Sequence, residues 1–369
     1  MQIIKNEIKE AGIDIDSNKT TYFLTDSLET FKNETSSFIF IPFKEAIKKY
    51  PDIIEKYTWK LVDKDKDDIT KKVYEETQGG YFIWLKEGHK EFLPLQACFY
   101  IKSSLYEQKV HNLIILEDNA ELHIINGCLS SSSSSDSTHY GITEIYVGKN
   151  SFLSYTMVHN WNETTEVRPR TGVKVNDGGK YVSNYIAFKD TKIVQSYPTV
   201  YLNKNSFASL NSIIYAKSGS VYDLGGRAIL LGENARADIN SRSVCDGGTV
   251  IARADISAEA DNTFGHIECS SIMLGHIECS SIMLDDKGKV HTIPELRTNK
   301  KNVTLSHEAM IGKIAESEIY YLMSRGFTES EAISLIVKGF LNIKIEGLPD
   351  VINKNIEEIL TLLESKNAL

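Results

Sequence analysis

The chain has 369 residues, of which 41% are hydrophobic and 25% charged, and its formal net charge is −9. This composition excludes a chain that is disordered throughout, and an acidic chain without a basic block is not expected to bind nucleic acid. No apolar run approaches the roughly 20 residues that a membrane span needs, and the first residues lack the apolar core of a signal peptide. We therefore expect a cytoplasmic protein without membrane contact. Its five scattered cysteines, an odd number, do not form a disulfide framework.

Three compositions follow one another along the chain. Residues 1–78 are rich in Lys, Glu, Asp and Ile and predict a helical or mixed region, in which residues 43–57 have the apolar spacing of one amphipathic helix. In residues 79–305, short stretches of Ile, Val, Tyr and Thr alternate with clusters of Gly, Asn, Asp and Ser, which is typical of strands and turns. Residues 306–369 return to helical patterns, so we expect three regions with these boundaries.

A polar tetrapeptide recurs between the strands of the middle region. Its five copies begin at Glu117, Gly148, Asn176, Asn203 and Gly232, so successive copies are 31, 28, 27 and 29 residues apart. A nearly constant period of this length indicates stacked supersecondary units, and the alternation between the turns gives each strand one buried face. No helical periodicity intervenes. We therefore predict a mainly β protein built as a solenoid, with a β-sandwich as the alternative.

Ten residues, Gly265 to Leu274, recur unchanged as Gly275 to Leu284. This tandem copy fits neither the spacing of the turns nor half of it. One copy must therefore add a strand out of phase or be extruded from the stack as a loop.

The C-terminal region predicts three helices. The first covers residues 316–324 and ends at Gly326, which suits the C′ position. Thr328 is the expected N-cap of the second helix, with Glu331 completing a capping box. The last helix is expected to start at Leu348.

Thiolate, imidazole and carboxylate groups gather in and after the duplicated element. Cys269 and Cys279 occupy equivalent positions in the two copies, and His291, His307 and Glu308 follow. These are ligand types for iron or zinc, although no compact CxxC spacing occurs. Buried cysteines on strand faces are the alternative, because free Cys is among the most buried residue types.

Two further features have side chains that could take part in chemistry, but each can also be explained by its role in the structure. Cys128 stands at the end of a predicted strand, where it is either a reactive or a buried thiol. His159 and Trp161 form a polar-aromatic cluster whose alternative is simple hydrogen-bonded packing. A β-helix hydrolase would need stacked carboxylates, and Asp238 and its successors Asp246 and Asp255 do not match the repeat.

From residue 79 onward the chain carries several longer motifs. They are Gly79-Gly-Tyr-Phe-Ile-Trp, Leu93-Pro-Leu-Gln, Asn126-Gly-Cys, Val158-His-Asn-Trp161, His291-Thr-Ile-Pro-Glu295, Ser306-His-Glu-Ala-Met-Ile-Gly-Lys313 and Tyr321-Leu-Met-Ser-Arg-Gly-Phe-Thr-Glu-Ser-Glu-Ala332. Together they resemble the SufB/SufD family of iron–sulfur cluster assembly proteins over residues 79–350. The resemblance is to the SufB branch, because SufD members more often carry Gly in the place of Glu308.

The resemblance implies a right-handed parallel β-helix with an α-helical N-terminal region and a C-terminal helical domain. It implies a scaffold rather than an enzyme, which receives sulfur from a cysteine desulfurase or as sulfide, builds a transient iron–sulfur cluster of the 4Fe–4S type and passes it to apo-proteins. The scaffold would be a homodimer, or a dimer with a SufD-like paralogue. Its C-terminal domain would dock SufC, an ABC-type ATPase, so ATP would act only through that partner. Flavin use stays open. The missing N-terminal cysteine motif implies the short archaeal type.

By position, the resemblance puts the cluster ligands at Cys279 and Glu308, with His307 and Cys269 as further candidates. Cys279 is preferred to Cys269 because it keeps the family's distance to the His-Glu-Ala motif. The predicted sulfur route comprises Cys128, His159 and Trp161, and the predicted SufC-docking surface comprises Tyr320, Tyr321, Arg325, Gly326 and Phe340.

Two departures from the family pattern affect the sulfur route. His159 stands where Gln is usual, and Tyr100 and Lys102 stand in the place of Arg-x-Asn at the expected entry. The alternatives to a scaffold are a SufD-like subunit without a cluster of its own and, more remotely, a β-helix carbohydrate-active enzyme.

Overall fold

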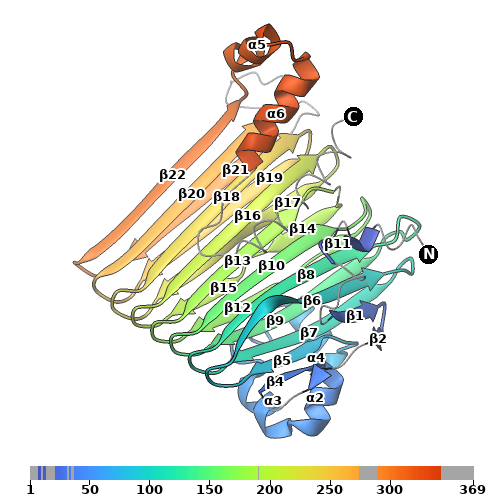
Figure 1. Ribbon diagram of the computed structural model, residues 1–369, viewed down its shortest axis with the longest axis vertical. Helices are drawn as coiled ribbons and strands as arrows, with labels where there is room; N and C mark the ends of the chain where they lie inside the picture. The colour runs from blue at the N-terminus through green and yellow to red at the C-terminus, as the bar shows by residue number, and fades with distance from the viewer. Residues whose placement is uncertain are drawn as a thin grey trace.

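The computed structural model describes residues 7–9, 11–13, 21–30, 33–34, 37–189, 191–273 and 289–341 (Figure 1). Its elements near the N-terminus are β1 (Thr21–Thr25), β2 (Leu28–Thr30), β3 (Asn33–Glu34), β4 (Phe38–Pro42), α2 (Phe43–Lys49), α3 (Pro51–Tyr57) and α4 (Asp68–Glu75). Two helices follow the last strand, α5 (Glu316–Ser324) and α6 (Glu329–Leu341). The helices lie at the two ends of a long stack of strands (Figure 1).

The stack consists of two sheets, which successive strands enter in turn. The first sheet contains β6 (Lys90–Ile101), β8 (Glu121–Ser130), β10 (Phe152–Asn160), β13 (Lys180–Ala187), β16 (Phe207–Lys217), β18 (Arg236–Asp246), β20 (Thr263–Met273) and β22 (Val303–Lys313). The second contains β5 (Tyr81–Leu85), β7 (Glu107–Leu116), β9 (Thr138–Val147), β11 (Glu166–Val167), β12 (Arg170–Val175), β14 (Ile193–Ser196), β15 (Thr199–Leu202), β17 (Val221–Leu230), β19 (Thr249–Ala258) and β21 (Lys289–Thr298). Hydrogen-bonded neighbours among these strands are parallel in both sheets. The two sheets together form a β-solenoid of about seven turns, which confirms the predicted fold class.

The register of the first sheet reproduces the spacing of the polar turns. Glu121 pairs with Phe152, which pairs with Lys180, and the series continues through Phe207 to Arg236. The offsets are therefore the same 31, 28, 27 and 29 residues that separate the tetrapeptides. The third residue of each tetrapeptide has a positive φ, which Asn and Gly tolerate better than other residues: Asn119, Asn150, Gly178, Asn205 and Asn234.

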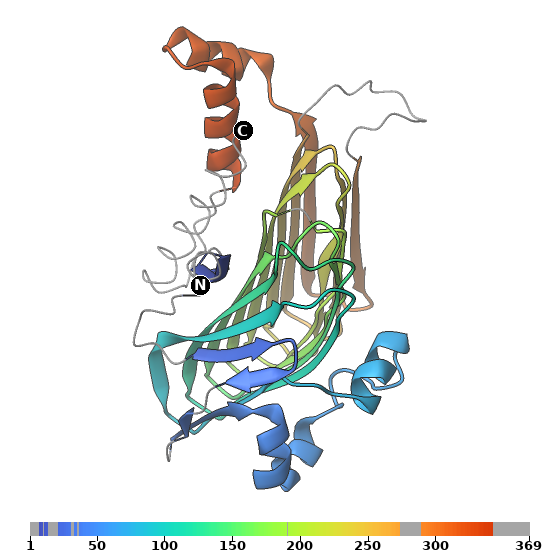
Figure 2. The same cartoon turned by 90° about the vertical axis from the view of Figure 1, so that its right-hand side faces the viewer.

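The main core fills the interior between the two sheets, which we call the lumen. Alternate residues of each strand point into it, such as Leu122 and Ile124 of β8 and Tyr222 and Leu224 of β17. A second apolar cluster covers the outer face of the first sheet. There, the side chains that point away from the lumen contact N-terminal residues (Ile8, Ala11 and Ile13) and α6 residues (Val337 and Leu341). Figure 2 shows both segments on the same flank of the solenoid.

The predicted helix over residues 43–57 is wrong in one respect, because two helices replace it. α2 ends at Lys49 and α3 begins at Pro51, and Tyr50 between them has φ −131° and ψ 51°. A proline restricts the residue before it and has no N–H for a helical hydrogen bond, so the helix breaks there. The apolar spacing is the same for one helix or two.

The sheets extend beyond residues 79–305 at both ends. Near the N-terminus, β1 pairs with β6 and β4 pairs with β5, so residues before 79 supply strands to both sheets. At the other end β22 continues to Lys313. The structure confirms the helix at 316–324, the positive φ of Gly326 (100°) and the capping box, in which the Thr328 N–H donates to Glu331 at 2.7 Å. The helix expected from Leu348 lies outside the described residues.

Residues 265–273 of the first copy of the duplicated decapeptide lie in β20, in phase with the stack. β20 follows β18 at an offset of 28 residues, but β22 follows β20 at an offset of 40. The second copy falls within residues 274–288, which lie outside the described residues.

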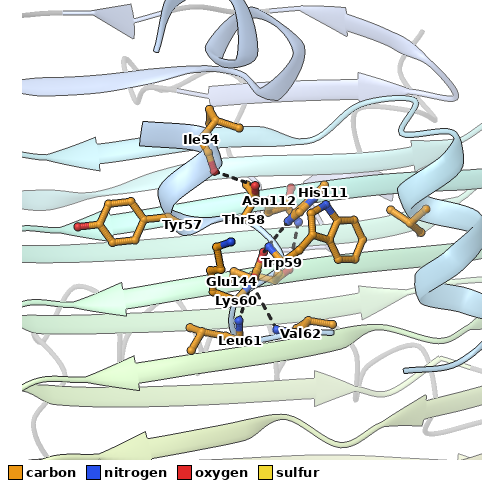
Figure 3. A network of polar contacts seen from close by, with 12 residues as sticks. Ile54, Tyr57, Thr58, Trp59, Lys60, Leu61, Val62, His111, Asn112 and Glu144 are labelled. Carbon is orange, nitrogen blue, oxygen red and sulfur yellow. Dashed lines mark hydrogen bonds and ion pairs between the residues drawn. The ribbon is translucent and has the colours of Figure 1, made fainter. Parts of the chain in front are cut away.

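A buried carboxylate ties the N-terminal region to the second sheet. The Glu144 side chain, on β9, accepts hydrogen bonds from the backbone N–H groups of residues 59–62 and lies 3.0 Å from Nε2 of His111 (Figure 3). Burial raises the pKa of Glu144, but the His111 hydrogen bond and the backbone N–H donors outweigh it, so the pKa lies below the ordinary value. The segment after α3 is thereby fixed against the strands.

Candidate functional site

Cys128 and His159 are direct neighbours in the first sheet. Cys128 of β8 is the register partner of His159 in β10, and both side chains point into the lumen. Cys128 is 1% exposed and His159 is 3% exposed. Gly127 leaves no room for a side chain on the outer face, because a Cβ there would lie 2.5 Å from the carbonyl oxygen of Ala11. The fold therefore brings together two of the three residues of the predicted sulfur route on one buried surface.

Hydrogen bonds and rings surround this pair. The Asn126 amide donates to Sγ of Cys128 at 3.4 Å, and the Tyr185 hydroxyl lies 2.6 Å from Nδ1 of His159. The ring of Trp161 lies 6.0 Å from the His159 ring, between centroids, so the third predicted residue belongs to the same cluster. Trp161 is fully buried, and within the described part of the chain its Nε1–H has no hydrogen-bond partner.

The cluster is uncharged at neutral pH. Burial raises the pKa of the Cys128 thiol well above its ordinary range, and nearby Cys98 adds to this effect. Burial lowers the pKa of His159 to about 3, with a contribution from His139, whose own pKa is lowered to about 3 by burial. Because a thiolate is the nucleophilic form of cysteine, Cys128 at rest is an unreactive thiol.

A second row of lumen positions links this cluster to Cys269. Each member is the register partner of the next on the adjacent strand: Asn126, Met157, Tyr185, Ser212, Ser241 and Cys269. All but Asn126 line one cavity of about 30 Å³, which has room for about one or two water molecules. We call these six residues the lumen row. Elsewhere the lumen is mostly apolar.

The lumen row was missed by the sequence analysis, although its signal was present. The turn spacings predict which positions stack, and adding them successively to Asn126 leads to Met157, Tyr185, Ser212 and Ser241. The offset of β20 then leads to Cys269. The family motifs point to single residues and do not carry this periodicity.

The predicted cluster ligands do not converge in the described structure. Glu308 of β22 is in register with Glu268, and Cys269 is in register with Ala309, so Glu308 and Cys269 point to opposite faces of the sheet. His307 is on the same face as Cys269. Cys279 lies outside the described residues.

Cys269 is an inert thiol in this setting. Burial raises its pKa to about 11, and the neighbouring Glu268 carboxylate adds to this. Within the described ranges, no three His, Cys, Asp or Glu side chains are arranged to hold a metal ion.

The predicted docking residues divide into an exposed and a packed group. Tyr320 and Tyr321 of α5 are 63% and 58% exposed, and the Arg325 guanidinium lies over the Tyr321 ring at 5.2 Å. Gly326 is exposed at the turn that follows. Phe340 of α6 instead packs against the outer face of the first sheet, where its carbonyl accepts from Arg242 at 3.4 Å. Of the predicted docking residues, the exposed aromatic side chains therefore belong to α5.

No described helix is long and apolar enough to cross a membrane. The carboxylates considered for a hydrolase lie on different strands, with Asp238 and Asp246 on β18 and Asp255 on β19 of the other sheet. They therefore form no stacked row.

Comparison with known proteins identifies the family of the chain. The family model described as "SUF system FeS cluster assembly, SufBD core domain" matches residues 99–340. An iron–sulfur cluster assembly SufBD family protein of Archaeoglobus fulgidus is 44% identical over 98% of this chain and 95% of its own length. A second, from Methanothermobacter thermautotrophicus, is 41% identical over 82% of this chain and 73% of its own. The iron–sulfur cluster assembly protein SufB of Bacillus subtilis is 30% identical over 86% of this chain and 66% of its own. The chain therefore belongs to the SufBD family of iron–sulfur cluster assembly proteins.

Proposed function

We propose that this chain is a cytoplasmic SufB-type scaffold, which accepts sulfur at Cys128, moves it along the lumen and builds a transient iron–sulfur cluster for delivery to apo-proteins. The observation that carries the proposal is the lumen row, which joins the surroundings of Cys128 to Cys269 through polar and sulfur-containing side chains. Polar side chains in an apolar core cost free energy unless they are hydrogen-bonded, so packing alone does not favour such a row. Membership of a cluster-assembly family supports the same chemistry.

Sulfur acceptance is a thiol–persulfide exchange. Sγ of Cys128 attacks the terminal sulfur of a donor persulfide, the S–S bond of the donor breaks, and the departing donor thiolate takes the proton that Cys128 releases. One sulfane sulfur is transferred without an external oxidant or reductant. Because the Cys128 thiol is protonated at rest, it stays unreactive until a donor supplies the base.

The cluster is the product that the scaffold carries. We propose Cys279 and Glu308 as its ligands, with His307 and Cys269 as the competing set, and a homodimer that supplies both pairs. Thiolates hold iron–sulfur clusters firmly, whereas carboxylates favour harder metals. A mixed site would hold a 4Fe–4S cluster loosely enough for transfer.

Side-by-side reconstitution of Cys279→Ala and Cys269→Ala with iron and sulfide under anaerobic conditions tests the cluster site. We expect loss of the visible charge-transfer absorption in Cys279→Ala only. Loss in Cys269→Ala alone moves the site into β20, and no loss in either favours a SufD-like subunit without its own cluster. Deleting either copy of the decapeptide produces the same polypeptide, which keeps one decapeptide and its single cysteine. This variant is the control that one copy is sufficient.

Sulfur acceptance is tested with Cys128→Ser. With a cysteine desulfurase as donor, cluster assembly should fall to background, whereas free sulfide should restore it because sulfide needs no protein-borne acceptor. Wild-type assembly from the desulfurase in Cys128→Ser rejects the assignment. Cys98→Ser is the matched control, since Cys98 is equally buried but packs on the outer face of the sheet.

We further propose that ATP acts only through a SufC-type ATPase docked on the C-terminal helices, and that the scaffold itself is not an enzyme. The exposed tyrosines of α5 support this docking surface. An exposed helix face is a common mode of recognition between proteins.

A further inference from the structure

Two buried histidines belong to this cluster: His159 is the register partner of Cys128, and the ring of His139 lies 5.1 Å from the Trp161 ring, between centroids. Their hydrogen bonds assign opposite tautomers to them. Nδ1 of His139 lies 2.9 Å from Oε1 of Gln108, whose amide nitrogen donates to the carbonyl of Asp26 at 3.0 Å. The Gln108 oxygen can only accept, so His139 carries its proton on Nδ1. Its Nε2 is then a bare acceptor.

His159 has the reverse arrangement. Its Nδ1 lies 2.6 Å from the hydroxyl of Tyr185, and within the described structure that hydroxyl has no other hydrogen-bond partner. The 2.6 Å separation is typical of an O–H donor and is shorter than the roughly 2.7–3.2 Å that an N–H donor gives. Tyr185 therefore donates, and the proton of the neutral ring is on Nε2.

We infer that Tyr185 is a positioning residue that holds His159 as its Nε2–H tautomer, so that His159 donates a hydrogen bond to anionic sulfur on Cys128 instead of removing the thiol proton. The inference deepens the proposed function, because it rests on sulfur acceptance at Cys128. It names the species that the site stabilises, the perthiolate of a Cys128 persulfide.

The neighbouring groups suit such an anion. The Asn126 amide already donates to Sγ of Cys128. The Nε1–H of Trp161, which has no partner among the described residues, is a further donor in the same cluster. No cation contacts the Cys128 thiol among the described residues. Neutral N–H donors can stabilise a sulfur anion through hydrogen bonds without a fixed positive charge that would trap it, so the sulfur can still move along the lumen row.

The tautomer is measured directly by long-range ¹H–¹⁵N correlation spectra of the full chain with ¹⁵N-labelled histidine. Loss of a signal in His159→Gln and in His139→Gln assigns the two rings. We expect the wild type to show Nε2–H for His159 and Nδ1–H for His139, and Tyr185→Phe to shift His159 towards the Nδ1–H form. Tyr181→Phe is the matched control, because Tyr181 is a buried lumen residue of the same strand that does not contact His159.

The role towards sulfur is tested by loading each variant with glutathione persulfide and following the persulfidated Cys128 peptide by mass spectrometry. Loss of one hydrogen bond to an anion should shorten the persulfide lifetime about tenfold in Tyr185→Phe, with Tyr181→Phe like the wild type. An Nδ1–H tautomer in the wild type, or an unchanged tautomer in Tyr185→Phe, overturns the positioning role. A shifted tautomer with an unchanged lifetime overturns the donor role. If wild-type Cys128 takes no sulfur, the proposed function fails, while the spectra still decide the tautomer.

Discussion

Cys269 and Glu308 lie on hydrogen-bonded neighbouring strands, yet they project from opposite faces of the first sheet. The cause is their register, in which Glu308 pairs with Glu268 and Cys269 pairs with Ala309. Because successive side chains of a strand alternate between faces, no change of rotamer brings the Glu308 carboxylate to the Cys269 thiol. His307 shares the face of Cys269.

Within one chain, this relationship separates the candidate ligands into two pairs. If Glu308 is a ligand, a cysteine of the same chain that joins it comes from outside the Cys269 position of β20, which favours Cys279. If Cys269 is the ligand, His307 is its partner. We expect Glu308→Ala to lose the reconstituted cluster together with Cys279→Ala, and His307→Ala to retain it together with Cys269→Ala.

The measurement is iron and sulfide content per chain after desalting, together with visible absorption. Each double variant within a pair should be no worse than its singles, because residues that act as one unit are non-additive. Cluster loss in His307→Ala with full content in Glu308→Ala would reverse the assignment.

The exposed tyrosines of α5 should be required for ATPase docking but not for folding. Replacing both Tyr320 and Tyr321 by Ala should weaken binding of a SufC-type ATPase at least about tenfold, because buried aromatic anchors dominate interface energies. The melting temperature should stay within a few degrees, since α5 has no buried residue. Binding is measured by calorimetry.

Leu28→Ala is the control for this experiment, because Leu28 is 70% exposed on β2, outside the C-terminal helices. It should leave ATPase binding unchanged. Equal binding by the tyrosine double variant and the wild type would place the docking surface elsewhere.

Glu144 should make the stability of the protein sensitive to acid. Its folded-state pKa is depressed, so its stabilising contribution is present above the ordinary glutamate value of 4.5 and is lost as the pH falls through the folded-state pKa. Glu144→Gln should cost about 3 kcal/mol of unfolding free energy at pH 7, because buried N–H donors lose a charged acceptor. The difference from the wild type should shrink below about pH 4.

Denaturant unfolding as a function of pH measures this effect. Glu107→Gln is the control, since Glu107 forms an exposed ion pair with Lys72 and should change stability by no more than about 0.5 kcal/mol. A pH-independent cost in Glu144→Gln would show that packing, and not the carboxylate charge, holds residues 59–62.

The turn asparagines have a positive φ, so replacing one of them by a residue with a larger side-chain constraint should lower the free energy of unfolding. Asn119 is exposed and has φ 60°. Asn119→Ala should therefore be less stable than Asn119→Gly by about 1 kcal/mol, because Ala is strained in the left-handed region. Thermal unfolding of the two variants measures the difference, and equal stability would indicate that the turn relaxes to a different conformation.

Much of the fold follows from the sequence by itself. In a solenoid each coil adds a nearly constant number of residues, so the spacing of the turns is also the register of the sheet. The tetrapeptide separations therefore predicted the strand offsets from Glu121 to Arg236, and the same arithmetic leads along the lumen row from Asn126 to Ser241. Local chemistry also determined the capping box at Thr328 and the turn at Gly326.

Only the tertiary structure decided the relationships that depend on contacts across the chain. The two decapeptide copies have the same sequence and therefore the same local strand propensity. That the first copy forms β20 follows from its pairing with β18, a contact between distant parts of the chain. The bond between Tyr185 and His159 needs two strands in register and two matching rotamers, and Glu144 meets residues that lie more than 80 positions away. A sequence pattern reports which face of a strand is buried, but it does not report which polar atoms meet there, because directional hydrogen bonds depend on distances that only the folded chain defines.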